Sequence, residues 1–230
     1  MRIVARPERP LAGLTVLAVE DSRYSSEALR LLCMRSGARM RRADCLRSAN
    51  RHLLSYRPDV AIIDLGLPDG DGTELIRYLA RATPRLPVII GLSGDPGSRE
   101  EVIAAGADGF LSKPLENLAI FQQAILSVLP ANMRRWSPIA VPNDLIMPDA
   151  ASLREDLAHV ADIISGITDT SRIAYIARFL EGIARSAHDE ALEAAATALV
   201  EDHRADRAVA TDLARISGMV QDRLTRTAGH

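Results

Sequence analysis

The sequence lacks a long apolar run and contains few cysteines, aromatic residues and lysines. A transmembrane helix needs about 20 consecutive, mostly apolar residues, and no stretch of this chain approaches that length. The first ten residues also lack the apolar segment of a secretory signal. Both observations predict a cytoplasmic protein that has no membrane partner.

The two cysteines, Cys33 and Cys45, have no second cysteine pair and no neighbouring histidine. This spacing excludes a zinc motif or a disulfide framework and predicts two free thiols. Lysine is rarer still, because Lys113 is the only one among the 28 basic residues. A lysine differs from an arginine in presenting a compact ammonium on a flexible stem. The composition therefore marks Lys113 as a candidate for a chemical role.

The net charge of −2 argues against a nucleic-acid partner, which usually requires a basic excess. Residues 1–130 contain 17 basic and 15 acidic residues, whereas residues 131–230 contain 11 arginines and 15 acidic residues. The C-terminal part is thus acidic. Beyond residue 148, its only aromatic residues are Tyr175 and Phe179.

Short apolar runs alternate with amphipathic stretches over the first 130 residues. The runs cover residues 14–19, 38–43, 59–63, 88–92 and 109–111, and the stretches with helical spacing cover residues 25–35, 47–56, 72–82, 99–105 and 116–129. Strands that are apolar throughout and separated by helices indicate a parallel sheet covered on both faces. We therefore predict an α/β domain at residues 12–130 with a doubly wound, five-stranded parallel sheet.

A proline-rich segment follows the predicted α/β domain. Four prolines between residues 130 and 148 exclude a long helix there. Residues 131–148 are therefore predicted to form an extended linker, with Trp136 and Ile146 as candidate anchors on a neighbouring surface.

Residues 149–227 contain no proline and show helical periodicity throughout. Ser152 and Glu155 form a capping-box pattern that predicts the start of a first helix, which would extend to about residue 167. Asp169 or Thr170 can cap a second helix. The third is expected at residues 189–202, and Val209 begins the apolar stripe of a fourth. Four amphipathic helices with short connections predict an all-α antiparallel four-helix bundle.

Charged and hydroxyl side chains follow the predicted strands at their carboxyl ends, where open α/β sheets bind ligands. These residues are Glu20, Asp21, Asp64, Ser93 and Lys113. Clustered carboxylates repel one another, and a hard divalent cation such as Mg²⁺ relieves that repulsion. Together with a lysine and a hydroxyl, such a cation can hold a phosphoryl group in line with an acceptor oxygen. The pattern predicts phosphoryl transfer to a carboxylate.

Residues 64–72, with the sequence DLGLPDGDG, complete a pattern that resembles response regulator receiver domains of two-component signalling. The resemblance extends over residues 14–129 and includes the acid pair Glu20 and Asp21, Ser93, and Lys113 followed by proline, with the aromatic Phe110 three residues before the lysine. It implies a flavodoxin-like fold and a histidine kinase or phosphotransfer protein as partner.

The resemblance also implies a role for each matching residue. Asp64 would be the phosphoacceptor, and Glu20, Asp21, Asp64 and the backbone carbonyl of Gly66 would bind Mg²⁺. Lys113 would pair with the phosphoryl oxygens, and Ser93 would hydrogen-bond one of them. Phe110 would then turn inward as a switch residue. Gly66 departs from the family, which commonly has a larger residue there.

Three interpretations of the C-terminal helices compete. A DNA-binding output domain is common in the family, but this region is acidic and has no helix–tight turn–helix with a basic second helix. A catalytic output domain would need a glycine-rich loop or paired histidine and aspartate ligands, neither of which the region contains. The third interpretation is a bundle similar to histidine-phosphotransfer (Hpt) domains. Its alternative is an unrelated alanine-rich four-helix bundle whose sequence matches the Hpt pattern only loosely.

Residues 177–182, ARFLEG, resemble the Hpt pattern Ala-His-x-Leu-Lys-Gly, with Arg178 in place of the phosphorylated histidine and Glu181 in place of the lysine. A guanidinium stays protonated and cannot serve as that nucleophile. His159 and His188 lie outside such a context. The sequence therefore predicts a non-enzymatic response regulator whose degenerate bundle binds an unknown protein, with a phosphate sink, an inert scaffold and a homodimer left open.

Overall fold

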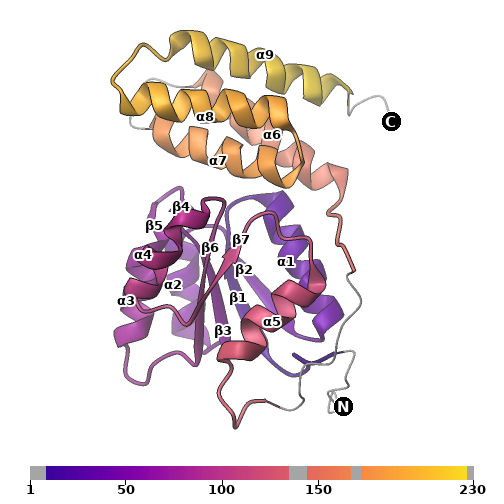
Figure 1. The fold of residues 1–230 in the computed structure, drawn as a ribbon, viewed down its shortest axis with the longest axis vertical. Coiled ribbons are helices and arrows are strands. Elements are labelled where there is room, and N and C mark those ends of the chain that lie inside the picture. Colours follow the sequence, from indigo (N-terminus) through magenta and orange to yellow (C-terminus); the bar gives the residue numbers. More distant parts are fainter. Residues whose placement is uncertain (1–8, 135–143, 167–171, 227–230) are drawn as a thin grey trace. The chain divides into compact units, whose positions relative to one another are not determined.

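The computed structural model of the chain describes residues 9–134, 144–166 and 172–226. They form two compact units, an α/β unit and a helical unit (Figure 1). None of the helices within these residues is long and apolar enough to cross a membrane.

The α/β unit contains a five-stranded, wholly parallel sheet with the strand order β2-β1-β3-β6-β7. Its strands are β1 (Thr15–Val19), β2 (Arg39–Ala43), β3 (Val60–Asp64), β6 (Val88–Ser93) and β7 (Gly109–Ser112). β3 is buried at every position, as its unbroken apolar sequence indicates. The predicted doubly wound sheet is therefore confirmed.

Helices cover both faces of this sheet (Figure 1). They are α1 (Arg23–Ser36), α2 (Leu46–Ser55), α3 (Gly72–Arg81), α4 (Arg99–Ala104) and α5 (Leu118–Val128), with a 3₁₀ turn at Pro96–Ser98. Because side chains alternate along a strand, Val16 and Ala18 of β1 pack in one core with α1 and α5. Leu17 and Val19 pack in the other core with α2, α3 and α4.

Two local features of the α/β unit differ from expectation. A two-stranded hairpin of β4 (Gly66–Leu67) and β5 (Gly70–Asp71) lies directly after β3, where no strand was predicted from the sequence. The last helix begins at Leu118 rather than at residue 116, because the Asn117 side chain accepts a hydrogen bond from the amide of Ile120 at 3.0 Å and caps the helix there.

The segment after the α/β sheet is anchored at its C-terminal end. Leu145 forms an antiparallel bridge with Asn117, and Ile146 is buried in the core that contains α5. Ile146 thus acts as the anchor that the sequence suggested, whereas Trp136 lies outside the described residues.

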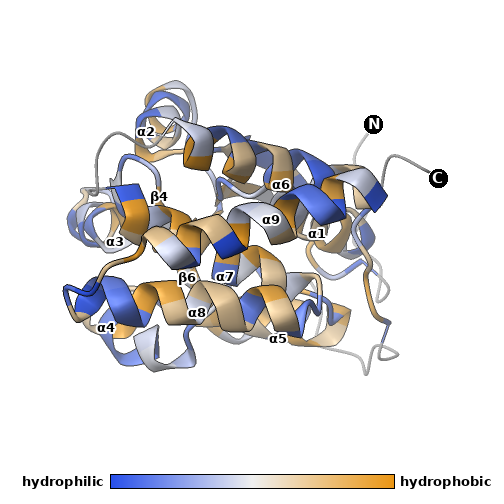
Figure 2. Cartoon of the chain, turned by 90° about the horizontal axis from the view of Figure 1, so that it is seen from above, coloured by the Kyte–Doolittle hydropathy of each residue, from blue (hydrophilic) through white to orange (hydrophobic). Residues whose placement is uncertain are grey.

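The helical unit consists of α6 (Ala150–Ser165), α7 (Ile173–Ser186), α8 (Glu190–Arg204) and α9 (Ala210–Arg226). Apolar side chains from all four helices meet in one core, including Leu157, Ile176, Leu199 and Val220. Figure 2 shows apolar and hydrophilic residues alternating along α8 and α9, as expected for amphipathic helices. These observations agree with the predicted bundle.

The start of the first bundle helix corrects the sequence interpretation. Asp149, not Ser152, is the N-cap, because its carboxylate accepts a hydrogen bond from the amide of Ser152 at 2.7 Å. Ser152 therefore lies inside the first turn, so the Ser152–Glu155 pair is not a capping box. The alternative caps of the second helix, Asp169 and Thr170, lie outside the described residues.

An ion pair joins two helices of the bundle and leads to a prediction. Asp189 caps α8 and accepts a 2.7 Å hydrogen bond from Nη2 of Arg223 on α9. We expect Arg223→Ala to lower the free energy of unfolding at neutral pH by about 1–2 kcal/mol, because a partly buried, charged hydrogen-bond pair is lost. The Arg226→Ala variant, which changes an exposed residue of the same helix, is the control for chemical denaturation.

The pH dependence of this effect follows from the pKa of Asp189, which the hydrogen bond from Arg223 lowers below its usual range. A lowered pKa in the folded state means that the stabilisation is present above the unfolded pKa and is lost as the pH falls through the folded value. The difference between wild type and Arg223→Ala should therefore shrink in acid. An equal loss of stability in Arg226→Ala would contradict the assignment.

The two cysteines occupy different environments, which labelling can test. Burial raises the pKa of Cys33 to about 12. Burial also raises the pKa of Cys45, but this residue is only half-buried before α2, so its thiol is accessible to a reagent. Since the thiolate is the reactive form, iodoacetamide should label one cysteine per native chain, and Cys45→Ser should abolish this labelling. Labelling of Cys33 at a similar rate in the folded Cys45→Ser protein would show that the core around α1 is open.

Candidate functional site

The carboxyl ends of the neighbouring strands bring the predicted site residues to one edge of the sheet. β3 lies between β1 and β6, and β6 pairs with β7. Glu20 and Asp21 directly follow β1, and Asp64 is the last residue of β3. Ser93 ends β6, and Lys113 follows β7, where its amide donates a 2.9 Å hydrogen bond to the carbonyl of Ser93.

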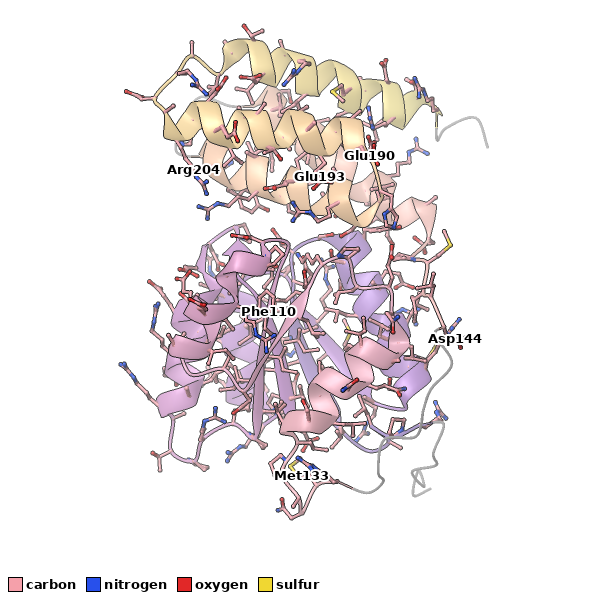
Figure 3. The ribbon with its side chains drawn as sticks, in the orientation of Figure 1. Phe110, Met133, Asp144, Glu190, Glu193 and Arg204 are labelled. Carbon is pink, nitrogen blue, oxygen red and sulfur yellow. The ribbon has the colours of Figure 1, made fainter. Side chains whose placement is uncertain are left out.

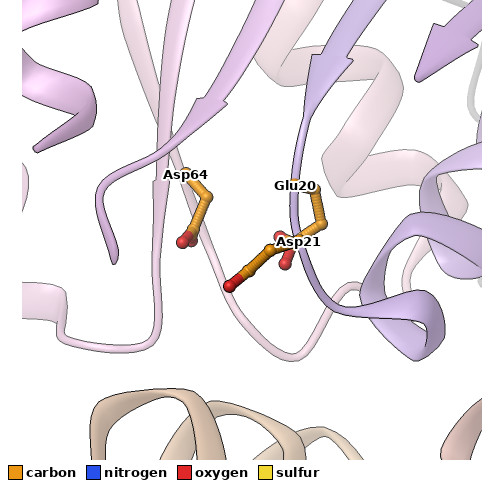
Figure 4. A group of neighbouring side chains, drawn as sticks. All are labelled: Glu20, Asp21 and Asp64. Carbon is orange, nitrogen blue, oxygen red and sulfur yellow. The ribbon is translucent and has the colours of Figure 1, made fainter. Parts of the chain in front are cut away.

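The three acidic side chains converge at this edge (Figure 4). Glu20, Asp21 and Asp64 each offer a carboxylate oxygen, and these oxygens all lie within 4.8 Å of one another. Glu20 and Asp64 are buried, whereas Asp21 is half-buried. An all-oxygen donor set with one accessible member suits a hard cation that retains several waters, as Mg²⁺ does. The residues present therefore fit a Mg²⁺ site.

Lys113 joins two of these carboxylates. Its Nζ lies 2.8 Å from Oε2 of Glu20 and 2.9 Å from Oδ1 of Asp64, and its side chain is only 8% exposed. Burial lowers the pKa of Lys113, but the attraction of Asp64 and Glu20 outweighs burial and leaves this pKa above its ordinary value. The ammonium therefore stays charged and offsets part of the negative charge of the cluster.

Glu20 remains electrostatically strained despite this ion pair. Burial raises the pKa of Glu20 well above its ordinary value, Lys113 lowers it, and the nearby Asp64 and Asp21 raise it again. The deprotonated form is therefore costly in the folded protein. A second positive charge at the cluster would stabilise the deprotonated form.

The loop after β3 holds the carboxylate of Asp64. The amide of Gly66 donates a 3.0 Å hydrogen bond to Oδ2 of Asp64, which leaves Oδ1 for Lys113. Gly72 at the start of α3 approaches the same residue so closely that a Cβ there would lie 2.0 Å from the carbonyl oxygen of Asp64. Any side chain at position 72 would displace this backbone, so glycine is required there.

Ser93 ends β6 beside this cluster, and Phe110 lies on the adjacent strand β7, opposite Gly91 of β6. The Oγ of Ser93 accepts a 3.1 Å hydrogen bond from the amide of Asp95, and the serine hydroxyl hydrogen can still be donated to another group. Phe110 of β7 is half-buried and packs against the core beneath α4 (Figure 3). The structure thus places Ser93 and Phe110 on neighbouring strands, and their role as a switch stays a prediction.

Two residues at the site were missed by the sequence interpretation. Arg42 on β2 donates hydrogen bonds to the backbone carbonyls of Glu20 and Asp21. Asp69, in the hairpin after Asp64, accepts hydrogen bonds from the amides of Leu46 and Arg47 and so caps α2. Both contacts link segments more than twenty residues apart. The pairing of β1 with β2, which places Arg42 beside Ala18, is the signal that could have indicated the contact of Arg42.

In the helical unit, Arg178 is exposed on α7. Glu181 forms an ion pair with Arg185, which also pairs with Glu193 on α8. A Cβ at Gly182 would meet nothing within 4 Å, so the helix surface is open at that position. Arg178 is the exposed residue of this part of α7, whereas Glu181 and Gly182 are half-buried, and residues 177–182 contain no histidine.

The described part of the α/β unit matches a known domain family. Residues 16–125 match the model of the response regulator receiver domain. The virulence transcriptional regulatory protein PhoP of Salmonella typhimurium is 35% identical over 129 residues, which are 55% of this chain and 55% of that protein. The transcriptional regulatory protein PhoP of Escherichia coli is 32% identical over 128 residues, also 55% of each chain. The chain thus spans about half the length of these curated relatives.

Solved structures show the same similarity. The signal receiver domain of a histidine kinase from Syntrophus aciditrophicus is 28% identical, covers 56% of this chain and 99% of its own length, and gives a TM-score of 0.47. The receiver domain of a sensor histidine kinase from Pseudomonas aeruginosa, described with magnesium in its active-site cleft, is 27% identical, covers 51% and 98%, and gives 0.45. Residues 16–125 of the chain are a two-component response regulator receiver domain.

Proposed function

We propose that the chain is a response regulator that receives a phosphoryl group on Asp64 from a histidine kinase or a phosphotransfer protein. The convergence of Glu20, Asp21 and Asp64 around the ammonium of Lys113 carries this proposal. An oxygen of Asp64 forms the new bond to phosphorus as the bond between phosphorus and the donor imidazole breaks, and the imidazole nitrogen then takes up a proton.

Each neighbouring residue has a part in this step. Glu20, Asp21 and Asp64, with the carbonyl of Gly66, would hold Mg²⁺, which neutralises charge on the phosphoryl oxygens when bound. The ammonium of Lys113 pairs with one of these oxygens, and the hydroxyl of Ser93 donates a hydrogen bond to another. The ion pair between Lys113 and Asp64 loosens as the aspartyl phosphate forms.

The result of phosphorylation is a change on the surface beside β7. The phosphoryl group adds a charge of about −1.5 to −2, and the hydrogen bond it forms draws Ser93 towards Asp64. Phe110 then turns into the space next to Ser93. This movement alters the surface of α4, β7 and α5, which is the surface that a partner or a second copy of the chain would recognise.

A phosphorylation assay tests this proposal. The chain is incubated with Mg²⁺ and a labelled phosphohistidine donor, alongside Asp64→Asn and the matched control Asp71→Asn. Asp71 is an exposed carboxylate that caps α3, and asparagine retains this capping function. We expect labelling of wild type and Asp71→Asn and at least a roughly 100-fold loss in Asp64→Asn, because the acceptor oxygen is absent. Equal labelling of Asp64→Asn would refute the assignment.

We further propose that the helical unit is a degenerate relative of Hpt domains that binds a protein. The match of residues 177–182, the exposure of Arg178 and the open surface at Gly182 support this proposal. The acidic composition of the region argues against nucleic acid as its partner. In this account the chain is cytoplasmic and has no enzymatic activity beyond phosphoryl transfer and loss at Asp64.

Restoring the missing nucleophile tests the degenerate bundle. The double variant Arg178→His/Glu181→Lys should acquire base-stable, acid-labile phosphohistidine in the presence of a phosphorylated receiver domain, whereas wild type should acquire none. The helical surface must then already have the shape that a receiver recognises. Arg204→His, at an exposed site on α8, is the control for fortuitous labelling. A double variant that folds but stays unlabelled would refute the Hpt relationship.

A phosphate sink is the second candidate function, favoured by the small Gly66 next to Asp64. Because glycine leaves the space beside the carboxylate open, water could approach an aspartyl phosphate readily. Rapid loss of phosphate from wild type, slowed at least several-fold in Gly66→Asn, would favour the sink.

A further inference from the structure

The guanidinium of Arg42 spans the backbone of both metal-binding acids. Arg42 lies near the end of β2, next to Ala18 of β1. Its Nε donates to the carbonyl of Glu20 at 3.3 Å, and its Nη2 donates to the carbonyl of Asp21 at 2.7 Å. One planar guanidinium therefore binds two consecutive backbone carbonyls beyond the end of β1. The ammonium of a lysine lacks the fixed, planar arrangement of donors that this requires.

The surrounding hydrogen bonds hold Arg42 and this backbone in register. The amide of Glu20 donates to the carbonyl of Ala43 at 2.9 Å, so one more backbone bond joins this segment to the end of β2. The ring nitrogen Nε2 of His52 on α2 lies 3.1 Å from the carbonyl oxygen of Arg42. The segment with Glu20 and Asp21 is thus fastened to β2 through both its amide and its carbonyls.

We propose that Arg42 is a positioning residue for the Mg²⁺ site, which orients the carboxylates of Glu20 and Asp21 by fixing the peptide groups to which they are attached. This inference rests on the proposed function, because it assumes that the acid cluster binds Mg²⁺. The ion requires nearly octahedral ligand geometry at about 2.0–2.1 Å, so a small rotation of either peptide group would move an oxygen out of place. Residues that orient metal ligands typically contribute 10–100-fold to affinity.

The positive charge of Arg42 and its two hydrogen bonds have opposite expected effects on the affinity for Mg²⁺. A guanidinium near the cluster repels a divalent cation, so removing its charge alone would strengthen Mg²⁺ binding. Removing the two hydrogen bonds frees the peptide groups and would weaken binding. The direction of the change in affinity therefore separates a positioning role from a simple electrostatic one.

The test is the Mg²⁺ dissociation constant of the full chain, measured by isothermal titration calorimetry. Arg42→Met keeps the aliphatic stem and should weaken binding by about 10-fold, whereas Arg42→Lys, which keeps the charge without the planar fork, should weaken it by about 3-fold. Arg39→Met, at an exposed position of the same strand, should bind as wild type does. At Mg²⁺ concentrations far above these constants, the phosphorylation rate of the Arg42 variants should return close to the wild-type rate.

The outcomes of this titration distinguish failure of the proposed function from failure of the role proposed for Arg42. Wild type that binds no Mg²⁺ would refute the proposed function itself. Wild type that binds Mg²⁺, together with Arg42→Met that binds it equally or more tightly, would overturn only the role of Arg42. If Arg42→Met does not fold, Arg42→Lys decides the question, and wild-type affinity in that variant would overturn the proposal.

Discussion

Replacing Lys113 with methionine is expected to lower the free energy of unfolding by about 3–5 kcal/mol at neutral pH in the absence of divalent cations. Methionine approximates the volume of the lysine stem but removes the ammonium, which lies 2.8 Å from Glu20 and 2.9 Å from Asp64. Both carboxylates are buried and would lose the cation paired with them. Urea denaturation measures the loss, with Arg81→Met on the exposed side of α3 as the control.

The pH dependence of this loss follows from Glu20. Burial raises the pKa of Glu20, and Lys113 lowers it, so the variant lacks the group that favours the deprotonated carboxylate. A raised folded-state pKa means that stability is greatest below the unfolded pKa and is lost as the pH rises through the folded value. The deficit of Lys113→Met should therefore be smaller at about pH 5 than at about pH 8. An equal deficit at both values would contradict the buried, coupled cluster.

Adding Mg²⁺ is expected to stabilise the wild-type chain by about 2.7 kcal/mol when its concentration is 100 times the dissociation constant. The proposed Mg²⁺ site is formed only by the folded protein, in which Glu20, Asp21 and Asp64 present oxygens within 4.8 Å of one another, whereas unfolding disperses these acids. Removal of the ion with a chelator should reverse the gain. Denaturation curves with and without the ion measure the effect.

Asp21→Asn should lose most of this Mg²⁺ stabilisation, because the variant lacks one anionic ligand at the half-buried side of the cluster. Asp71→Asn, which changes an exposed acid outside the cluster, should retain it. Identical stabilisation of wild type and Asp21→Asn would indicate that Mg²⁺ binds elsewhere on the protein.

The receiver fold and its site could be predicted because the relevant signals are local. Buried parallel strands appear as short apolar runs, and the residues that follow them belong to the ligand-binding edge of the sheet. Glu20, Asp64 and Lys113 each come directly after or at the end of such a run. Their place along the chain therefore indicated their place in the fold, and the structure brings them together.

Features that depend on distant segments could not be predicted in this way. The contact of Arg42 with the acid pair depends on which strand lies beside β1, and nothing in residues 39–43 alone indicates it. The start of α6 was misread because both Asp149 and Ser152 can cap a helix. The hydrogen bond from the amide of Ser152 to the carboxylate of Asp149 identifies the earlier residue as the cap.

The most direct test of phosphorylation on Asp64 is to determine which residue of the wild-type chain carries the phosphoryl group. The chain is phosphorylated with and without Mg²⁺, and its peptides are analysed by mass spectrometry after reductive trapping of acyl phosphates. If the buried cluster needs a cation to accept a phosphoryl group, Asp64 should be modified only when Mg²⁺ is present. Modification of another residue, or equal modification of Asp64 in the presence of a chelator, would contradict it.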